Sequence, residues 1–265
     1  MSKIKFYVTK NENFFIIFQY GKINEYITCL FIGVLMNRIL FIFAFFLISS
    51  VFANEIDSEI QKYSLTQNRI NEIGADILNY NKIPKRVVFA YNDTDKKRML
   101  DIYGELTKRQ VVVYDEYYKN ASDDNELAGL LAREIALVIK SYKGMWGGRI
   151  DAMQIAASPK KFEVFADKRA VDFMVKAGYN PIALITYINK TCPQKRSDKI
   201  SRTNLTSKRL AIIYEYITYK YPEFLENNEY ENNKYYQNFL LNSLSNRALL
   251  NEKIKTKSTK ELKYE

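Results

Sequence analysis

Helical spacing of the apolar residues dominates the chain after residue 54 and most constrains what it can fold into. The stretches with this spacing are residues 55–80, 124–141, 161–177 and 206–220. Only 86–91 and 110–114 are typical of strands, with a weaker extended segment at 99–103. We therefore expect an α+β fold that is mainly helical, with a small three-stranded sheet.

Capping residues mark several helix ends. Asp123 precedes the helix at 124–141 and Glu126 lies three residues further on, which is a capping-box arrangement. Gly178 follows the next long helix and is expected in a left-handed cap. Pro181 then suits the first position of another helix, because proline has no N–H to lose there.

The chain divides by pattern into three parts. Residues 1–53 form an N-terminal extension with a signal peptide, 54–222 form the main domain, and 223–265 form a C-terminal part. Within the last part, 235–250 predicts one helix and the lysine-rich stretch 252–265 is typical of a solvated tail. The tyrosine-rich residues 114–118 are expected in the sheet and core rather than in a binding cage.

The N-terminal part carries a targeting signal. After Met36, a basic Arg38 leads into an apolar run over residues 39–48, and small residues end at Ala53. This pattern predicts a secretory signal peptide cleaved after Ala53, with Met36 as the true start and the protein exported to the periplasm or cell envelope. The alternative is an inner-membrane anchor over residues 26–53, although Arg38 in its middle opposes that interpretation.

Charge and cysteine content exclude some functions. The formal net charge is +10, but the basic residues form no clustered stripe and no nucleic-acid-binding module, so we expect no nucleic-acid partner. Of the two cysteines, Cys29 is removed with the leader. Cys192 then has no partner for an internal disulfide, and we expect it to be a partly buried small side chain.

Two segments carry a family resemblance. One helix reads Glu126-Leu-Ala-Gly-Leu-Leu-Ala-Arg-Glu-Ile-Ala-Leu-Val138, and the other reads Glu163-Val-Phe-Ala-Asp167, followed by Ala177-Gly-Tyr-Asn-Pro181. Together they resemble the gluzincin zinc metallopeptidases of the CAAX prenyl protease and HtpX type, which include BepA-like periplasmic proteases. The resemblance spans residues 86–222 and implies a zincin-like domain, its sheet packed on the active-site helix and the glutamate helix.

The resemblance also assigns a role to individual positions. In the family, two histidines one helical turn apart bind zinc, and the glutamate beside the first activates water. Here Arg133 and Leu137 take the histidine positions, and Glu134 takes the general-base position. Glu163 takes the position of the third ligand, and Asp167 that of the carboxylate that orients a ligand.

A later family element is changed in the same way. Asn204 replaces its histidine, whereas its arginine is kept as Arg209, which we expect to be structural. The whole chain contains no histidine. Because Arg133 has no lone pair to donate and Leu137 has no donor atom, we expect neither the zinc of the family nor any other cofactor.

A structural hypothesis follows for Arg133. Its guanidinium should lie near Asp167 and Glu163 and neutralise them in place of a metal. Replacing Arg133 by alanine should then cost about 3–5 kcal/mol, the range for breaking a buried ion pair.

Three functions remain open. The first is a non-catalytic, exported protein that binds an extended peptide or an unfolded envelope protein, with an edge strand pairing with the peptide. The second is an active metalloendopeptidase with rearranged ligands, and the third is a purely structural envelope domain. Contact with a membrane is expected only through the N-terminal segment, if it is not cleaved.

Overall fold

The computed structural model describes residues 58–84, 86–94, 109–141, 159–192 and 206–264. It is mainly helical, as predicted, with a small sheet, and it divides into two compact units, Met1–Lys62 and Tyr63–Glu265. The sheet and the helices that surround the candidate site belong to the second unit. None of the described helices is both long enough and apolar enough to cross a bilayer.

The sheet consists of two parallel strands in the described residues. Strand β1 (Val88–Asn92) pairs with β2 (Gln110–Tyr114), so that Val88 lies opposite Gln110 and Asn92 opposite Tyr114. The third strand expected at 99–103 falls outside the described residues and stays a prediction. Alternate residues of β2, Val111 and Val113, are buried, and this strand packs on helix α4.

A helix that ends at Tyr80 packs closely on the sheet. Gly74 of this helix has no room for a side chain, because an added Cβ would lie 2.5 Å from an atom of the Phe89 ring. Non-bonded carbon atoms essentially never come so close, so a side chain at position 74 would force the Phe89 ring to move. Tyr63, at the other end of the helix, donates a hydrogen bond to the carbonyl oxygen of Tyr91 at 3.0 Å.

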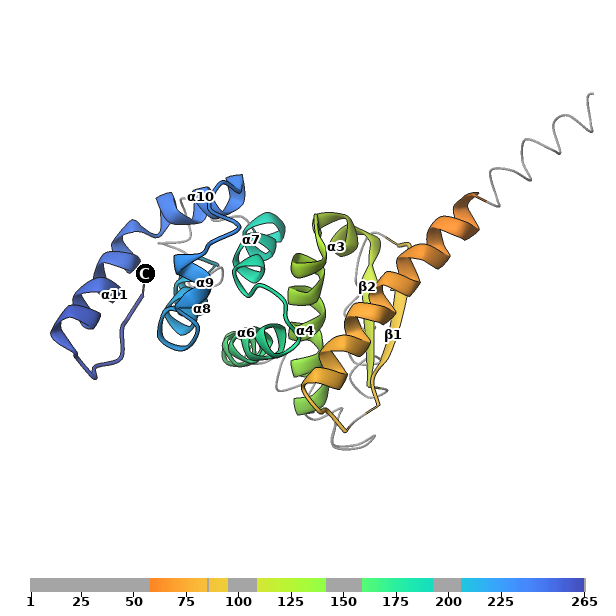
Figure 1. The fold of residues 1–265 in the computed structure, drawn as a ribbon, viewed down its shortest axis with the longest axis horizontal. Helices are drawn as coiled ribbons and strands as arrows, with labels where there is room; N and C mark the ends of the chain where they lie inside the picture. The colour runs from red at the N-terminus through yellow and green to blue at the C-terminus, as the bar shows by residue number, and fades with distance from the viewer. Residues whose placement is uncertain (1–57, 85, 95–108, 142–158, 193–205, 265) are drawn as a thin grey trace, which may run out of the picture. The chain divides into compact units, whose positions relative to one another are not determined.

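Four helices form the centre of the fold. They are α4 (Asp124–Ser141), α6 (Pro159–Lys176), α7 (Ile182–Thr191) and α8 (Thr206–Lys220). Figure 1 shows α4 between the sheet and α6, and its contacts are with β2, α6 and α7. All side chains from Ile182 to Asn189 are buried, because α7 is surrounded by α4, α8 and α10.

The predicted caps at Asp123 and Gly178 are confirmed, whereas Pro181 lies at the N-cap of α7, one residue before the first helical position expected for it. Asp123 Oδ1 accepts a hydrogen bond from the Glu126 amide at 2.8 Å at the start of α4. Gly178 has φ = +84° beyond the end of α6. Its amide donates to the Val175 carbonyl and the Tyr179 amide donates to the Met174 carbonyl, at 3.1 and 2.9 Å. This pair of bonds defines a Schellman motif.

The C-terminal part differs from the prediction. Instead of one helix at 235–250, two helices form, α10 (Lys234–Asn242) and α11 (Leu244–Thr256), after a short α9 (Glu223–Glu226). The prediction of a solvated tail at 252–265 is also wrong in part. Lys253 forms an ion pair with Glu215 at 2.9 Å, and Tyr264 is buried, so this stretch folds back near α8.

Two smaller expectations have different outcomes. The tyrosine-rich stretch packs in the core as expected, because Tyr114 ends β2 and is buried and Tyr117 and Tyr118 pack against the core. The sheet goes no further, however, because helix α3 (Asp115–Asn120) begins directly after β2. Cys192, at the end of α7, is exposed rather than partly buried. Helix α7 ends at Thr191, and Cys192 follows it as the C-cap residue.

Candidate functional site

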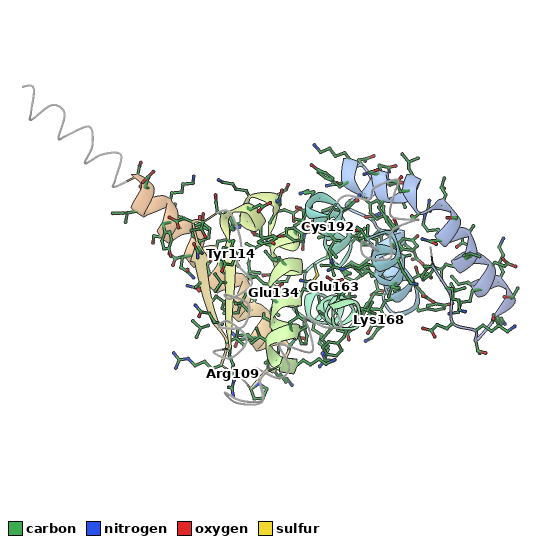
Figure 2. All side chains as sticks on the ribbon, turned by 180° about the vertical axis from the view of Figure 1, so that it is seen from behind. Arg109, Tyr114, Glu134, Glu163, Lys168 and Cys192 are labelled. Carbon is green, nitrogen blue, oxygen red and sulfur yellow. The ribbon has the colours of Figure 1, made fainter. Side chains whose placement is uncertain are left out.

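Helices α4 and α6 bring the predicted site residues together. Arg133, Glu134 and Leu137 lie on α4, and Glu163 and Asp167 lie one turn apart on α6. Because α4 and α6 pack against each other, side chains of the two helices meet, and Figure 2 shows Glu134 and Glu163 on these neighbouring helices. The predicted proximity of Arg133 to Asp167 and Glu163 is confirmed by distances of 3.3 and 3.8 Å.

Asp167 is the centre of this group, which we call the arginine–carboxylate cluster: Arg133, Glu134, Glu163, Asp167 and Arg209. The Asp167 side chain is 1% exposed. Arg209 of α8 donates to both of its oxygens, from Nε at 2.5 Å and from Nη2 at 2.6 Å, which is a bidentate pair. Arg133 Nε donates to Asp167 Oδ1 at 3.3 Å. One buried carboxylate therefore joins α4, α6 and α8.

Arg133 has further acidic neighbours. Its Nη1 donates to Glu134 Oε1 at 2.9 Å, and its Nη2 lies 3.8 Å from Glu163 Oε1. Burial alone would lower the pKa of Arg133, but the charges of Glu134, Asp167 and Glu163 outweigh burial and hold this pKa above its ordinary value. The guanidinium is thus a permanent cation in this position.

The remaining predicted positions lie differently. Leu137 is half-buried and packs against the hydrophobic core, one turn along α4 from Arg133. Asn204 lies outside the described residues, so its predicted place stays untested. Glu134 and Glu163 are 20% and 42% exposed, and they form the part of the cluster that solvent reaches.

Tyr187 was not singled out by the sequence, yet it borders the cluster. It lies on the buried helix α7, and its hydroxyl donates to the Tyr117 carbonyl oxygen at 3.1 Å. Burial raises the pKa of Tyr187 above its ordinary value, and the negative charge of Glu134 adds to the effect. No motif marks this tyrosine, because its position depends on the packing of α7 against α3 and α4.

The residues present do not fit the zinc of the gluzincin family. Catalytic zinc sites use three protein ligands, and only carboxylates are available around Arg133. A guanidinium offers no lone pair, and its charge repels a metal ion. In the described part of the chain, no three histidine, cysteine, aspartate or glutamate residues are arranged to hold a metal. We therefore derive no chemical step through zinc.

A second buried ion pair was also missed by sequence reasoning. Glu126 is fully buried and accepts hydrogen bonds from Thr186 Oγ1 and from the Ser122 amide, each at 2.7 Å. It also forms an ion pair with Lys190, whose Nζ donates to Ser122 Oγ at 2.6 Å. The capping-box residue therefore also joins α4 to α7.

Comparison with models of protein families, with curated proteins and with solved structures found no match. The resemblance to gluzincin peptidases therefore remains a prediction from sequence motifs.

Proposed function

We propose that this is an exported, non-catalytic protein on a zincin-like, gluzincin-type scaffold that binds an extended peptide or an unfolded envelope protein. The observation that carries the proposal is the cation at position 133. Arg133 lies among Glu134, Glu163 and Asp167, where a working peptidase of this family would need a metal and a free general base.

The state of Glu134 supports the absence of catalysis. A general base must accept a proton from water, but Glu134 Oε1 already accepts a hydrogen bond from Arg133. The same contact is an ion pair, with Arg133 Nη1 2.9 Å from Glu134 Oε1. Its inherited position is therefore better suited to an ion pair than to activating water.

The sheet supports the binding of an extended peptide. In the described residues β1 and β2 pair only with each other, so each strand has one edge without a strand neighbour. Such an edge offers backbone N–H and C=O groups to an incoming strand. Export through the signal peptide at residues 36–53 would place this binding in the periplasm or cell envelope; the alternative location is an inner-membrane anchor over 26–53.

The metal content of the full-length protein, measured together with its cleavage of casein, tests the first half of the proposal. We expect no stoichiometric zinc, no cleavage, and no change in melting temperature on adding a chelator. One equivalent of zinc with a cleavage activity that Glu134→Gln abolishes would instead establish the alternative, an active metalloendopeptidase with rearranged ligands.

The second half of the proposal is tested by binding. Calorimetric titration of the same sample with unfolded casein should give saturable binding, whereas a folded protein of similar charge should not bind. Failure to bind any unfolded chain would favour a purely structural envelope domain.

A further inference from the structure

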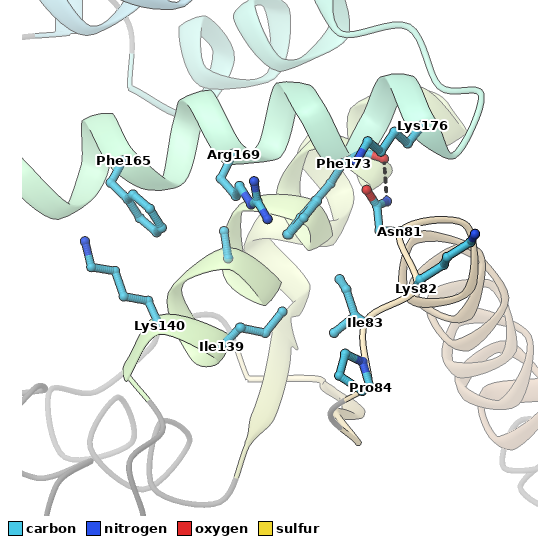
Figure 3. Close-up of a pocket in the computed structure, with 11 residues that line it drawn as sticks. Asn81, Lys82, Ile83, Pro84, Ile139, Lys140, Phe165, Arg169, Phe173 and Lys176 are labelled. Carbon is cyan, nitrogen blue, oxygen red and sulfur yellow. Dashed lines mark hydrogen bonds between the residues drawn. The ribbon is translucent and has the colours of Figure 1, made fainter.

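A groove separate from the arginine–carboxylate cluster lies between the C-terminal half of α4, helix α6 and the turn after the helix that ends at Tyr80, the N-terminal helix of the described residues (Figure 3). Its volume is about 570 Å³, which is in the range of ligand-binding pockets. Apolar side chains line it from all three elements: Ile83, Pro84, Ala136, Ile139, Phe165 and Phe173. Phe165 remains 37% exposed, although a phenylalanine of this size is usually covered.

Four cations surround these apolar side chains, and no acidic residue is among the described residues that line the groove. They are Lys82, Lys140, Arg169 and Lys176. One lies in the turn after the N-terminal helix, one on α4, and two on α6, about two helical turns apart. The positive charge is therefore distributed along the groove and is not concentrated at one point. Such a charge pattern favours a ligand with several negative charges.

Two of the cations cover the aromatic rings. Lys140 Nζ lies 3.7 Å from the centre of the Phe165 ring, and Arg169 Cζ lies 5.0 Å from the centre of the Phe173 ring. Figure 3 shows both pairs inside the groove. Each pair combines an apolar surface with a positive charge, so it can contact an apolar side chain and a carboxylate at once.

The other two cations have no ion-pair partner in the described part of the chain. Lys82 occupies the turn after the N-terminal helix, with φ = +52°, and Lys176 is the last residue of α6. Among the described residues neither lysine neutralises an acid, so both ammonium groups can contact a ligand.

Hydrogen bonds fix one side of the groove relative to the other. Asn81 Nδ2 donates to the carbonyl oxygens of Ile77 and Phe173, each at 2.9 Å, and so ties the turn to α6. The Lys82–Pro84 side of the groove is therefore held against the α6 side. A site that is formed before the ligand arrives loses less entropy on binding.

We propose that this groove binds an extended, acidic peptide segment of a partner protein, with apolar side chains between its carboxylates. This inference rests on the proposed function, the binding of an extended peptide, and adds a binding place separate from the edge of the sheet. Arg169 and Lys176 are seven residues apart on α6, so about 10 Å separates them along the helix axis. About three residues of extended chain span that distance, which matches carboxylates repeated along a peptide. A lipid has one anionic pole and fits this spread of charge less well.

Isothermal titration calorimetry on the full-length protein tests the assignment. The probe is a synthetic peptide of about ten residues with glutamate at every third position and leucine between, and its control has glutamine in place of every glutamate. We expect the acidic peptide to bind at least about tenfold more tightly than the glutamine peptide, with an affinity that falls as salt is added.

Two double variants each remove two positive charges, one pair from the groove and the other pair from a different part of the surface. Lys82→Gln with Lys176→Gln removes two cations of the groove, and Lys168→Gln with Lys208→Gln removes two that line another pocket. We expect the first variant to bind the acidic peptide about tenfold more weakly and the second to stay within about twofold. Melting temperatures should show that both variants are folded.

The outcomes separate the two proposals. Equal binding of both peptides with no effect of the groove variant would overturn the acidic groove and leave peptide binding intact. Equal loss in both variants would show a general charge effect and would also overturn it. No binding of either peptide by a folded protein that still binds unfolded casein would overturn the groove alone, whereas loss of all three interactions would overturn both proposals. Binding of phosphatidylglycerol vesicles alone, lost in the groove variant, would replace the peptide by a lipid.

Discussion

Replacing Asp167 by asparagine should destabilise the protein more than removing either of its arginine partners. The change keeps the shape of the side chain but removes its charge and places an amide N–H₂ against the guanidinium donors. Arg209 would lose its bidentate partner, with contacts of 2.5 and 2.6 Å, and Arg133 would lose the contact at 3.3 Å. Breaking a buried ion pair from one side costs about 3–5 kcal/mol.

The solvent exposure of the two arginine partners decides where in that range the loss of unfolding free energy should lie. The side chains of Arg133 and Arg209 are 19% and 14% exposed, so some water can reach the charges that the change leaves unpaired. We therefore expect Asp167→Asn to lower the free energy of unfolding by about 3 kcal/mol, the lower end of the range.

The arginine variants should cost less, and in a defined order. Arg209→Ala leaves Asp167 with only the longer contact to Arg133 and should cost about 2–3 kcal/mol. Arg133→Ala leaves the bidentate pair of Asp167 and Arg209 intact, and its other partners are partly exposed, so about 1–2 kcal/mol is expected. The structure thus lowers the value expected from the sequence alone for Arg133→Ala, because Arg209 supplies a second cation.

Urea unfolding followed by circular dichroism measures these differences. Glu163→Gln is the matched control, because this carboxylate is 42% exposed and lies 3.8 Å from Arg133, so its loss should change stability by less than about 0.5 kcal/mol. A double-mutant cycle should show a larger coupling of Asp167 with Arg209 than with Arg133. If Asp167→Asn left stability within about 0.5 kcal/mol of the parent, or if Arg133→Ala were the most damaging change, the reasoning would be refuted.

Three further predictions follow from other contacts. Glu126→Gln should lower the free energy of unfolding by about 3 kcal/mol in urea titrations, because it leaves the buried Lys190 without its carboxylate, and adding Lys190→Met should recover part of the loss. Gly178→Ala should cost about 1 kcal/mol from the backbone alone, since nothing lies within 4 Å of the added Cβ, and Gly178→Asn should cost less. Burial and Asp76 raise the pKa of Tyr179 to about 12, so the folded state keeps a proton that the unfolded chain loses from about pH 10. The urea midpoint should therefore fall between about pH 10 and about pH 12, and a midpoint that rises there would contradict this assignment.

Much of the helical framework could be predicted from local signals. The bounds of α4 and α8 are those expected, because Asp123 caps the first and Pro222 closes off the second. Where such signals are weak, the prediction failed. The break at Ser243 between α10 and α11 involves neither glycine nor proline, so the two helices were read as one. Helix α3 has six residues, too few for a helical period to show.

The candidate site was predictable only in part. The resemblance to the gluzincin motifs predicted that Arg133 and Asp167 lie close together on two helices, and the structure has them in contact. The bidentate contact of Arg209 with Asp167 joins residues 42 positions apart, and neither periodicity nor spacing predicts such a contact. The ion pair of Glu126 with Lys190 is of the same kind, because it depends on how α7 packs against α4.

Because of the arginine–carboxylate cluster, substitutions that would convert this centre to a metal site should each lower the stability of the fold. Arg133→His would exchange a permanent cation for a ring that is mostly neutral at pH 7, leaving Glu134 and Glu163 less well compensated. Leu137→His would place a polar ring against the hydrophobic core. Each step lowers stability before three ligands exist to bind an ion. The intermediates would thus be less stable than this protein and would have no metal affinity to offset the loss, so acquiring a metal site would require several simultaneous substitutions.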